Sequence, residues 1–556
     1  MRSILAFVFI TISFSALTQV SSNAYPPMKT PLQLTSNFAE YRKNHFHSGI
    51  DIGVRNRTDM SVFSIWDGYV SRVRFNSASY GRAVYITHPN GYTSVYGHLD
   101  SFAPFIDSLV TRYQYQNKVF ETDIEIPAGT VPVKKGQVIG IAGNSGYSFG
   151  AHLHFEIRDA STEEPVNPLK FIPVDDLQEP QFKQIAVFQM QQGLFLPAKG
   201  TYYNIVKSGK IYTTTAEIVV PDTFFLGFNI QDYQSYAYYR LLPQTIDMLI
   251  DDSLVWQIEF NRFSFDQSGA CRGVFDHAAG LKDYRQVVLT YTGNHLRQRF
   301  YKKYSNDGLF ILPDHERHKL TVKATDTEFN TSVFSTTIKK STSTSKIPAE
   351  KNIIRTGYFH DFSTEHLALS CDTGTFFADL ALAEPLLTES GSGNNMVWKI
   401  GFDEIPLIKP MHVYFLPSAM PDEKTLFAKT TSKGIDKVWK PVSISDGRMG
   451  VDIDRPGTFV FFRDTIAPVI AKTTIPASRK LTWQKEIVLI VADNSGEFSK
   501  YNAYINGEWT LMIYDLKSDS FTIPLSTEKK SKLTDLKVEF TDLAGNTTIR
   551  EYSFLR

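Results

Sequence analysis

Short runs in which apolar and polar residues alternate, separated by turn residues, cover most of the chain. Residues 61–75 (SVFSIWDGYVSRVRF) place β-forming side chains on both sides of Asp67-Gly68, and residues 82–98 repeat the pattern around Pro89-Asn90-Gly91. A turn such as Pro89-Asn90-Gly91 between two β-rich runs predicts a β-hairpin. The run AHLHFEIRD (151–159) alternates in the same way and predicts a further strand. Helical periodicity does not continue beyond about a dozen residues, so the pattern predicts a mainly β protein.

Changes in this pattern divide the chain into successive units. The pattern predicts a small β-sheet or barrel-like domain over 25–175, a β-sandwich over 180–340, a β-rich domain over 350–464 and a C-terminal Ig-like β-sandwich over 465–556. The run of serine and threonine from Ser341 to Ser345 is interpreted as a linker. Inside the first unit, residues 101–131 are too long for a hairpin turn and predict a flap or an extra subdomain.

Two stretches far apart in the chain end in the same way. An alternating strand is followed by Asp326 and Asn330 in one stretch, and by Asp542 and Asn546 in the other. This echo predicts two related sandwich domains that each close with a hairpin. Acidic turns can bind calcium, but two oxygen-bearing residues four positions apart are weak evidence, and we interpret both as structural turns.

Charge and the N-terminal residues restrict the class of protein. Lys and Arg balance Asp and Glu at 58 each, which argues against nucleic acid as a partner. Arg2 precedes an apolar run from Ile4 to Leu17, and Ser22-Asn23-Ala24 has the form of a cleavage site, so residues 1–24 are predicted to be a signal peptide. The run is shorter than the roughly 20 residues that span a bilayer. We therefore expect an exported protein, periplasmic or extracellular in the cell envelope, with no transmembrane segment after cleavage.

The two cysteines, Cys271 and Cys371, carry little information. Export makes a disulfide between them possible, and two free buried thiols fit the sequence equally well. Neither is predicted to be catalytic.

The residues with recognisable chemistry lie before residue 160. Six histidines fall in three clusters or beside them: His45 and His47 near Asp51, His88 and His98 further on, then His152 with His154. Residues at i and i+2 of a strand share a face, so His152 and His154 are expected to point into one site, where one binds a metal and the other handles protons. His47 and Asp51 would add a nitrogen and an oxygen ligand. Two His and one Asp leave a fourth tetrahedral position open, as in catalytic zinc sites.

The order HSGID, SVYGHLD and GNSGYSFGAHLHFE, with the phrases DGYV, VKKGQVIGIAGNSG and HPNGY, resembles the lysostaphin-type (LytM-like, β-lytic) zinc metalloendopeptidases that hydrolyse peptidoglycan. The resemblance covers about residues 35–170. It implies one Zn²⁺ per chain held by His47, Asp51 and His154, and it matches His98 and His152 to the two active-site histidines that do not bind the metal. The first domain is thereby expected to be a metallopeptidase domain.

The remaining roles follow from the chemistry of these groups. His152 is assigned as the general base that orients the attacking water, and His98 as the group that binds the oxyanion or assists the leaving amine; the two roles could be exchanged. Glu156 is interpreted as a supporting or structural residue, His88 as a turn or supporting residue, and His45 as a residue outside the ligand set. Tyr80 and Tyr147 are expected in loops beside the groove.

These expectations define a leading function and two alternatives. The leading function is hydrolysis of peptide bonds in peptidoglycan stem peptides or cross-bridges. The alternatives are a metalloprotease that acts on exported proteins, and a non-catalytic module that binds the wall or activates another hydrolase. The β-sandwich tail is a candidate site for a protein partner or a spacer.

Overall fold

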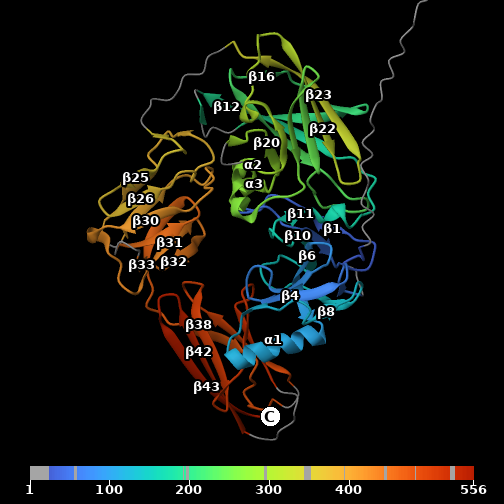
Figure 1. The fold of residues 1–556 in the computed structure, drawn as a ribbon. Helices are drawn as coiled ribbons and strands as arrows, with labels where there is room; N and C mark the ends of the chain where they lie inside the picture. Colours follow the sequence, from blue (N-terminus) through green and yellow to red (C-terminus); the bar gives the residue numbers. More distant parts are fainter. Residues whose placement is uncertain are drawn as a thin grey trace, which may run out of the picture.

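The computed structural model describes residues 24–55, 59–191, 193–195, 200–293, 297–342, 352–392, 395–443, 448–481, 484–525 and 533–556. Strands predominate throughout these ranges, so the prediction of a mainly β protein is confirmed (Figure 1). The predicted signal peptide lies outside the described residues except for Ala24, as does most of the predicted linker at Ser341 to Ser345. Within the described ranges, no helix combines the length and the apolar character needed to cross a membrane.

The N-terminal part is built on one sheet with the central order β1-β2-β10-β6-β5-β4-β7. Four short strands pair beside this path: β11 with β10, β8 with β4, and β3 with β9, which also pairs with β6. The strands of this sheet are β1 (Leu34–Ser36), β2 (Ile50–Gly53), β3 (Ser61–Phe63), β4 (Gly68–Phe75), β5 (Arg82–Thr87), β6 (Tyr92–Phe102), β7 (Thr122–Glu125), β8 (Pro132–Val133), β9 (Val138–Ala142), β10 (His152–Asp159) and β11 (Pro165–Val166), followed by the short helix η1 (Pro168–Lys170).

The hairpin predicted around Pro89-Asn90-Gly91 is confirmed, because β5 and β6 pair antiparallel there. Gly91 has a φ of +83°, a conformation that suits glycine. The β-forming residues on either side of Asp67-Gly68 in 61–75 do form two strands, which pair with other partners and not with each other: β3 pairs with β9 and β4 pairs with β5.

The stretch 101–131 contains a helix that the sequence pattern did not predict, α1 (Pro104–Asn117). Pro104 stands at its first turn, and its buried residues Ile106, Val110 and Gln114 are spaced four apart, which is the helical period. Lys118 ends the helix in the left-handed conformation. After the helix the chain returns to the sheet as β7 on the edge of β4, so the stretch adds a helix and an edge strand to the first sheet.

The second part forms a large sheet system over residues 181–340, to which two short strands from further along the chain are added. Its strands are β12 (Gln181–Gln191), β13 (Leu194–Phe195), β14 (Thr201–Ser208), β15 (Ile211–Thr214), β16 (Ile218–Val220), β17 (Phe224–Gln231), β18 (Thr245–Ile250), β19 (Ser253–Glu259), β20 (Val287–Leu289), β21 (Tyr301–Tyr304), β22 (Arg317–Thr325), β23 (Thr331–Lys340), β24 (Ile353–Ile354) and β27 (Leu380–Ala381). Its short helices are η2 (Phe265–Ala270), α2 (Cys271–Val274), α3 (His277–Asp283) and η3 (Ser305–Gly308).

The third part carries two sheets, ordered β25-β26-β30-β34-β33 and β28-β29-β35-β31-β32. Its elements are β25 (His360–Ser363), β26 (Leu367–Cys371), β28 (Leu387–Ser390), β29 (Val397–Ile400), β30 (Met411–Phe415), η5 (Pro417–Ala419), β31 (Thr425–Thr431), β32 (Gly434–Trp439), β33 (Val442–Ser443), β34 (Met449–Ile453) and β35 (Gly457–Arg463). Cys271 and Cys371 are both buried and free, which decides between the two alternatives for these cysteines.

The C-terminal part has two sheets, ordered β36-β37-β41-β40 and β39-β38-β42-β43, that enclose a hydrophobic core of their own. Its strands are β36 (Val469–Thr473), β37 (Glu486–Ala492), β38 (Phe498–Ile505), β39 (Glu508–Trp509), β40 (Ile513–Asp515), β41 (Ser520–Pro524), β42 (Leu533–Asp542) and β43 (Thr547–Leu555). Both predicted closing hairpins are present, as β22 pairs with β23 and β42 with β43.

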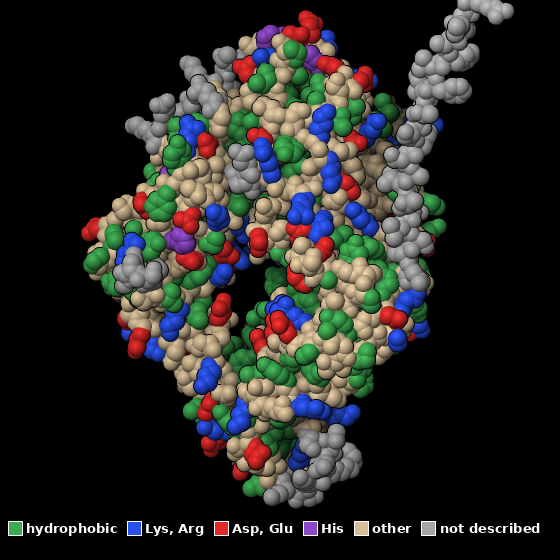
Figure 2. Space-filling model, viewed as in Figure 1, with side chains coloured by type: hydrophobic (Ala, Val, Ile, Leu, Met, Phe, Trp, Pro, Cys, Tyr) green, Lys and Arg blue, Asp and Glu red, His purple; other side chains and the backbone are tan. Residues whose placement is uncertain are grey.

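Side-chain contacts join the four parts into a ring, and Figure 2 shows an opening near its centre. Arg272 of the second part donates to the carbonyl of Leu407, and Lys424 Nζ of the third part lies 3.1 Å from the carbonyl oxygen of Ala544. The ring closes where the C-terminal part meets α1 and its following loop: the Phe120 ring stacks on Tyr501, with centroids 5.0 Å apart (Figure 1).

The connection between the first and second parts bears most directly on the site. Phe38 and Phe46 do not join the core of the first sheet; they are buried with Phe263, Phe275 and Phe300 in the core of the second part. The segment that precedes His47 is thus fixed to the second part by aromatic packing.

Candidate metal centre

Three neighbouring strands bring the histidine clusters together. β10 lies between β2 and β6, with His154 opposite Asp51 on one side and opposite Gly97 on the other. His47 comes from the loop that leads into β2. Leu153 and Phe155 are completely buried in the core of the sheet, so the alternation predicted for β10 directs His152 and His154 to the other face.

One atom from each of His47, Asp51 and His154 meets the other two at short range. His47 Nε2 lies 3.1 Å from Asp51 Oδ1 and 3.1 Å from His154 Nδ1, and His154 Nδ1 lies 2.9 Å from Asp51 Oδ1. A tetrahedral zinc ion with 2.0–2.1 Å bonds separates its ligand atoms by about 3.3 Å. All three residues are buried, and two imidazoles with one carboxylate are donors that suit zinc. The residues present therefore fit the metal.

Hydrogen bonds on the outer side of the two imidazoles fix which nitrogen faces the site. His47 Nδ1 lies 2.8 Å from the carbonyl oxygen of Asn37, which leaves Nε2 for the metal. His154 Nε2 lies 2.8 Å from Glu156 Oε1, which leaves Nδ1. Such outer partners orient metal ligands and raise their basicity.

Asn37 is itself held by the second part of the molecule. Its side-chain amide donates to the carbonyl of Leu242 at 2.7 Å, and its side-chain oxygen accepts from the N–H of Leu242 at 2.9 Å. The orientation of His47 therefore depends on a residue that is clamped between two parts of the chain.

Glu156 is completely buried and is the centre of a polar network. Its Oε1 accepts hydrogen bonds from Ser48 Oγ at 2.5 Å and Tyr80 OH at 2.6 Å, in addition to its contact with His154, and its Oε2 accepts one from Arg158 Nε at 2.6 Å. Against the effect of burial, Arg158 and His154 hold the pKa of Glu156 well below its usual range. The carboxylate stays ionised and supports His154 electrostatically.

The acid–base state of the metal-free ligands follows from the same contacts. Burial disfavours ionised Asp51, but His47 and the contacts with His152 and His154 hold its pKa well below the usual range. Burial also opposes protonation of His154, yet Asp51 and Glu156 raise its pKa to about 9. Because a histidine binds a metal in its neutral form, metal binding at His154 would release this proton.

His98 and His152 stand beside the three ligands with the same tautomer. His98 Nδ1 lies 2.8 Å from the carbonyl oxygen of Ser145, and His152 Nδ1 lies 2.8 Å from that of Gly150. Because a carbonyl oxygen only accepts, both Nδ1 atoms carry the hydrogen and both Nε2 atoms are free of it in the neutral rings. The centroids of the His98 and His152 rings lie 4.9 Å apart, and His152 Nε2 lies 3.4 Å from Asp51 Oδ1.

His98 occupies a strained position. Its φ is +58°, and its N–H donates to the carbonyl of Tyr80 at 2.8 Å, next to an irregularity in the pairing of β6 with β9. Non-glycine residues in this conformation cluster at functional sites. Burial, with His154 and His152 close by, lowers the pKa of His98 to about 3, so the ring is neutral.

The other residues noted in the sequence fall into clear places. His45 is exposed and contacts Asn44, outside the ligand set as expected. His88 is buried between the carbonyl of Asp67 and the hydroxyl of Ser94, a supporting role as expected. Tyr80 belongs to the Glu156 network, whereas Tyr147 is 63% exposed on the loop before His152.

Sequence reasoning did not identify Asn37, Ser36 or Arg42 as part of the site. Ser36 Oγ lies 3.2 Å from His47 Nδ1, and an Arg42 guanidinium nitrogen lies 3.4 Å from Asp51 Oδ2. These contacts join short loop segments with no motif, and one of them is made by a backbone carbonyl. The signal for Glu156 was present, since it lies two residues after His154 on the same strand face.

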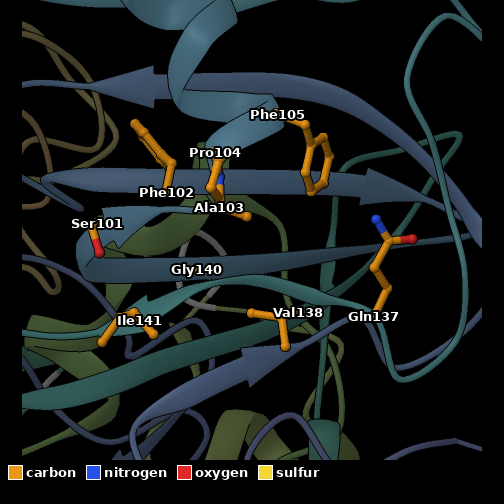
Figure 3. Close-up of a pocket in the computed structure, with 9 residues that line it drawn as sticks. All are labelled: Ser101, Phe102, Ala103, Pro104, Phe105, Gln137, Val138, Gly140 and Ile141. Atoms are coloured by element: carbon orange, nitrogen blue, oxygen red, sulfur yellow. The ribbon is translucent and has the colours of Figure 1, made fainter.

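A pocket of about 520 Å³ lies elsewhere, where the end of β6 meets the start of α1 (Figure 3). Phe102, Phe105, Val138 and Ile141 give it a largely apolar lining. Figure 3 shows these side chains on β6, β9 and the first turn of the helix. None of the five site residues lines it, so it is separate from the metal centre.

Three converging side chains that could hold a metal ion, with two neighbouring imidazoles on a β-sheet, are the arrangement expected of a metallohydrolase site. The comparisons specify the family. The model of peptidase family M23 matches residues 45–115 and 106–168, and this part of the chain is an M23 peptidase domain.

Named relatives agree over the same part of the chain. The chain is 31% identical over 132 residues to the DD-carboxypeptidase/endopeptidase Mpg of Neisseria meningitidis serogroup B (strain ATCC 13091 / M2091), which covers 24% of each protein. It is 31% identical over 154 residues to the peptidoglycan DD-endopeptidase ShyB of Vibrio cholerae, covering 27% of this chain and 30% of ShyB. The chain therefore aligns with about a quarter to a third of the length of these relatives.

Among solved structures, a zinc-containing peptidase from Vibrio cholerae is 27% identical, with 27% of this chain and 39% of that chain covered and a TM-score of 0.19.

Proposed function

We propose that the protein is an exported zinc-dependent endopeptidase of the cell envelope that hydrolyses peptide bonds in peptidoglycan stem peptides or cross-bridges. The observation that carries this proposal is the combination of three converging ligand atoms with two imidazoles whose Nδ1 hydrogens are held by backbone carbonyls. The match to peptidase family M23 and the names of the relatives support the choice of substrate.

His47, Asp51 and His154 would hold the zinc ion. When bound, zinc supplies a Lewis acid that lowers the pKa of water from 15.7 towards about 7 and polarises the substrate carbonyl. The outer contacts from Asn37 and Glu156 keep the two imidazoles in the tautomers and orientations that ligation requires.

His152 is proposed as the general base. Its Nε2 is free of hydrogen and lies on the side of Asp51 Oδ1, and its side chain is 16% exposed, so a substrate can approach it. In the neutral ring His98 Nε2 carries no hydrogen, so His98 would bind the oxyanion or assist the leaving amine after Nε2 has taken up a proton. The two roles stay interchangeable because both rings have the same tautomer.

The test uses the purified full chain and purified sacculi. Released muropeptides are analysed by mass spectrometry with and without a chelator, for the natural chain, for His152→Ala and for His315→Ala. We expect new amine ends that disappear on chelation, return with zinc and are absent for His152→Ala. His315→Ala is the matched control, because this exposed histidine lies in the second part of the chain and its loss is expected to leave cleavage intact.

Other outcomes would select an alternative. Cleavage of protein substrates but not of sacculi would support the exported metalloprotease. Stoichiometric zinc binding with no cleavage of either substrate would refute peptidase activity and would support a non-catalytic module that binds the wall or activates another hydrolase. The β-sandwich tail would then be examined as the partner-binding part.

A further inference from the structure

Two clusters of aspartates lie outside the peptidase domain, one in each of two β-sandwich units. One carboxylate oxygen from each of Asp176, Asp232 and Asp326 lies within 4.8 Å of the other two. Asp464, Asp493 and Asp542 form a second cluster by the same criterion. Both clusters consist of oxygen donors alone.

The first aspartate of each cluster sits in the connection that enters its sandwich. Asp176 Oδ1 accepts the N–H of Gln178 at 3.0 Å, and Asp464 Oδ1 accepts the N–H of Ile466 at 3.1 Å. In both connections the aspartate side chain accepts from the backbone N–H two residues later, so the two connections have the same local structure.

The last aspartate of each cluster follows or ends the first strand of the closing hairpin. Asp326 Oδ1 accepts the N–H of Asn330 at 2.9 Å, and Asp542 Oδ1 accepts that of Asn546 at 2.8 Å. In both, the other carboxylate oxygen accepts the side-chain amide of the same asparagine at 2.8 Å.

Each asparagine also reaches back to the connection. Asn330 donates to the carbonyl of Asp176 at 3.4 Å, and Asn546 donates to that of Asp464 at 3.1 Å. The echo seen in the sequence is therefore one arrangement that occurs twice, with the entering connection tied to the closing hairpin around three carboxylates.

Buried acceptor atoms without a partner belong to residues of both clusters. Asp232 is 4% exposed and its Oδ1 has no hydrogen-bond partner. Asp464 is completely buried and its Oδ2 has no hydrogen-bond partner. Asp493 Oδ2 is also a buried atom without a hydrogen-bond partner. An ionised carboxylate in such surroundings is costly unless a cation or a donor meets it.

The charges that act on these groups are those of the other aspartates. Burial, with Asp326 and Asp176, raises the pKa of Asp232 to about 8. Burial, with Asp464 and Asp542, raises the pKa of Asp493 above its usual range, in spite of hydrogen bonds from Ser495. In both cases burial and the neighbouring carboxylates are what raise the pKa.

We propose that each cluster binds one calcium ion. Calcium takes six to eight oxygen ligands in flexible geometry, and carboxylates with backbone carbonyls are its usual protein ligands. Zinc, copper and nickel prefer the nitrogen or sulfur donors that both clusters lack. Magnesium keeps several of its waters, which the buried carboxylates leave little room for.

The position of the clusters gives the bound ion a structural task. Asp176 lies two residues after Val174, which packs in the core of the peptidase domain. Asp464 directly follows β35 of the third part and precedes β36 of the C-terminal part. A calcium ion at each cluster would tie these two connections to the sandwiches that follow them and stiffen both junctions.

The test titrates calcium chloride into the zinc-loaded full chain by isothermal titration calorimetry, with magnesium chloride in a parallel run. We expect two calcium ions per chain. Asp232→Asn and Asp493→Asn should each lose one ion and keep the other, so that the remaining site reports correct folding. Asp252→Asn, an exposed aspartate paired with Lys319, is the matched control and should bind two ions.

Thermal unfolding separates calcium binding from a merely structural role of the aspartates. In calcium-free buffer above pH 8, where Asp232 is ionised, Asn at position 232 removes a repelling charge, so Asp232→Asn should melt at or above the temperature of the natural chain. When calcium is added, the melting temperature of the natural chain should rise by more than that of this variant. A lower melting temperature for Asp232→Asn in both buffers would indicate a structural role and overturn the proposal.

Two further results would overturn it: no binding up to about 10 mM calcium, well above the 10⁻⁴–10⁻³ M range of extracellular calcium modules, or equally tight binding of magnesium. Zinc loading and the zinc-ligand variant His154→Ala check that the counted calcium is not at the peptidase site, because His154→Ala should still bind two calcium ions.

Discussion

Replacing Glu156 with Gln tests whether the polar network behind His154 supports metal binding. The glutamate has no exposed surface, and it accepts from Ser48 and Tyr80 as well as contacting His154 on one oxygen, while Arg158 donates to the other. Gln has nearly the same shape but offers one acceptor oxygen and one NH₂ group. Whichever way the amide turns, a donor faces either His154 with its neighbours or Arg158.

The size of the effect follows from these contacts. Loss of an outer partner of a metal-binding histidine typically lowers metal affinity by about 10- to 100-fold, which is about 1.4 to 2.7 kcal/mol. Removing one charge of a buried ion pair costs about 3–5 kcal/mol of folding stability, because the other charge stays buried without its partner. The Glu156→Gln variant should therefore lose both zinc affinity and stability.

Zinc affinity is measured by competition with a chromogenic chelator, and stability by chemical unfolding of the metal-free protein. Glu163→Gln is the control, since Glu163 also bonds Arg158, at 3.2 Å, but its side chain is 55% exposed. Its effects should be small, as for most exposed ion pairs. A folded Glu156→Gln variant with the zinc affinity of the natural chain would refute the proposed support of His154.

Three further predictions concern groups outside the ligand set. Burial lowers the pKa of His88 from 6.5 to about 4, so below pH 6.5 the unfolded state binds more protons than the folded state. The free energy of unfolding, measured by chemical denaturation, should therefore fall by at most about 1.4 kcal/mol per pH unit from pH 6.5 towards 4. The His88→Gln variant should lack this part of the pH dependence. Phe46→Ala removes a completely buried ring beside His47 and should cost about 3–5 kcal/mol of stability together with zinc affinity, whereas Phe105→Ala, at a 38% exposed ring, should leave zinc affinity unchanged. A double-mutant cycle on Phe120 and Trp509, whose rings stack at 5.0 Å, should give a coupling energy of about 0.5–1.5 kcal/mol, and a value near zero would contradict docking of the C-terminal part on α1.

The sequence was informative where a short period carries the structure. The alternation in β10 placed His152 and His154 on one face, and the turn at Gly91 placed β5 against β6. It was less informative for α1, whose buried positions Ile106 and Val110 are surrounded by residues common in strands. The partner of β3 could not be predicted, because pairing between distant strands depends on the whole core and not on the strand's own pattern.

The same limit applies to the residues behind His47, and it has a functional consequence. Asn37 holds His47 through its backbone carbonyl, which every residue possesses, so no side-chain motif marks it. Its side chain is in turn bonded on both ends to the backbone of Leu242, in the second part of the chain. Because the same segment is anchored through Phe46 in the core of that part, a ligand of the proposed zinc site is positioned by a β-sandwich outside the family match. The sandwich next to the peptidase domain therefore supports the site directly, and a peptidase domain expressed without that sandwich should bind zinc more weakly than the full chain.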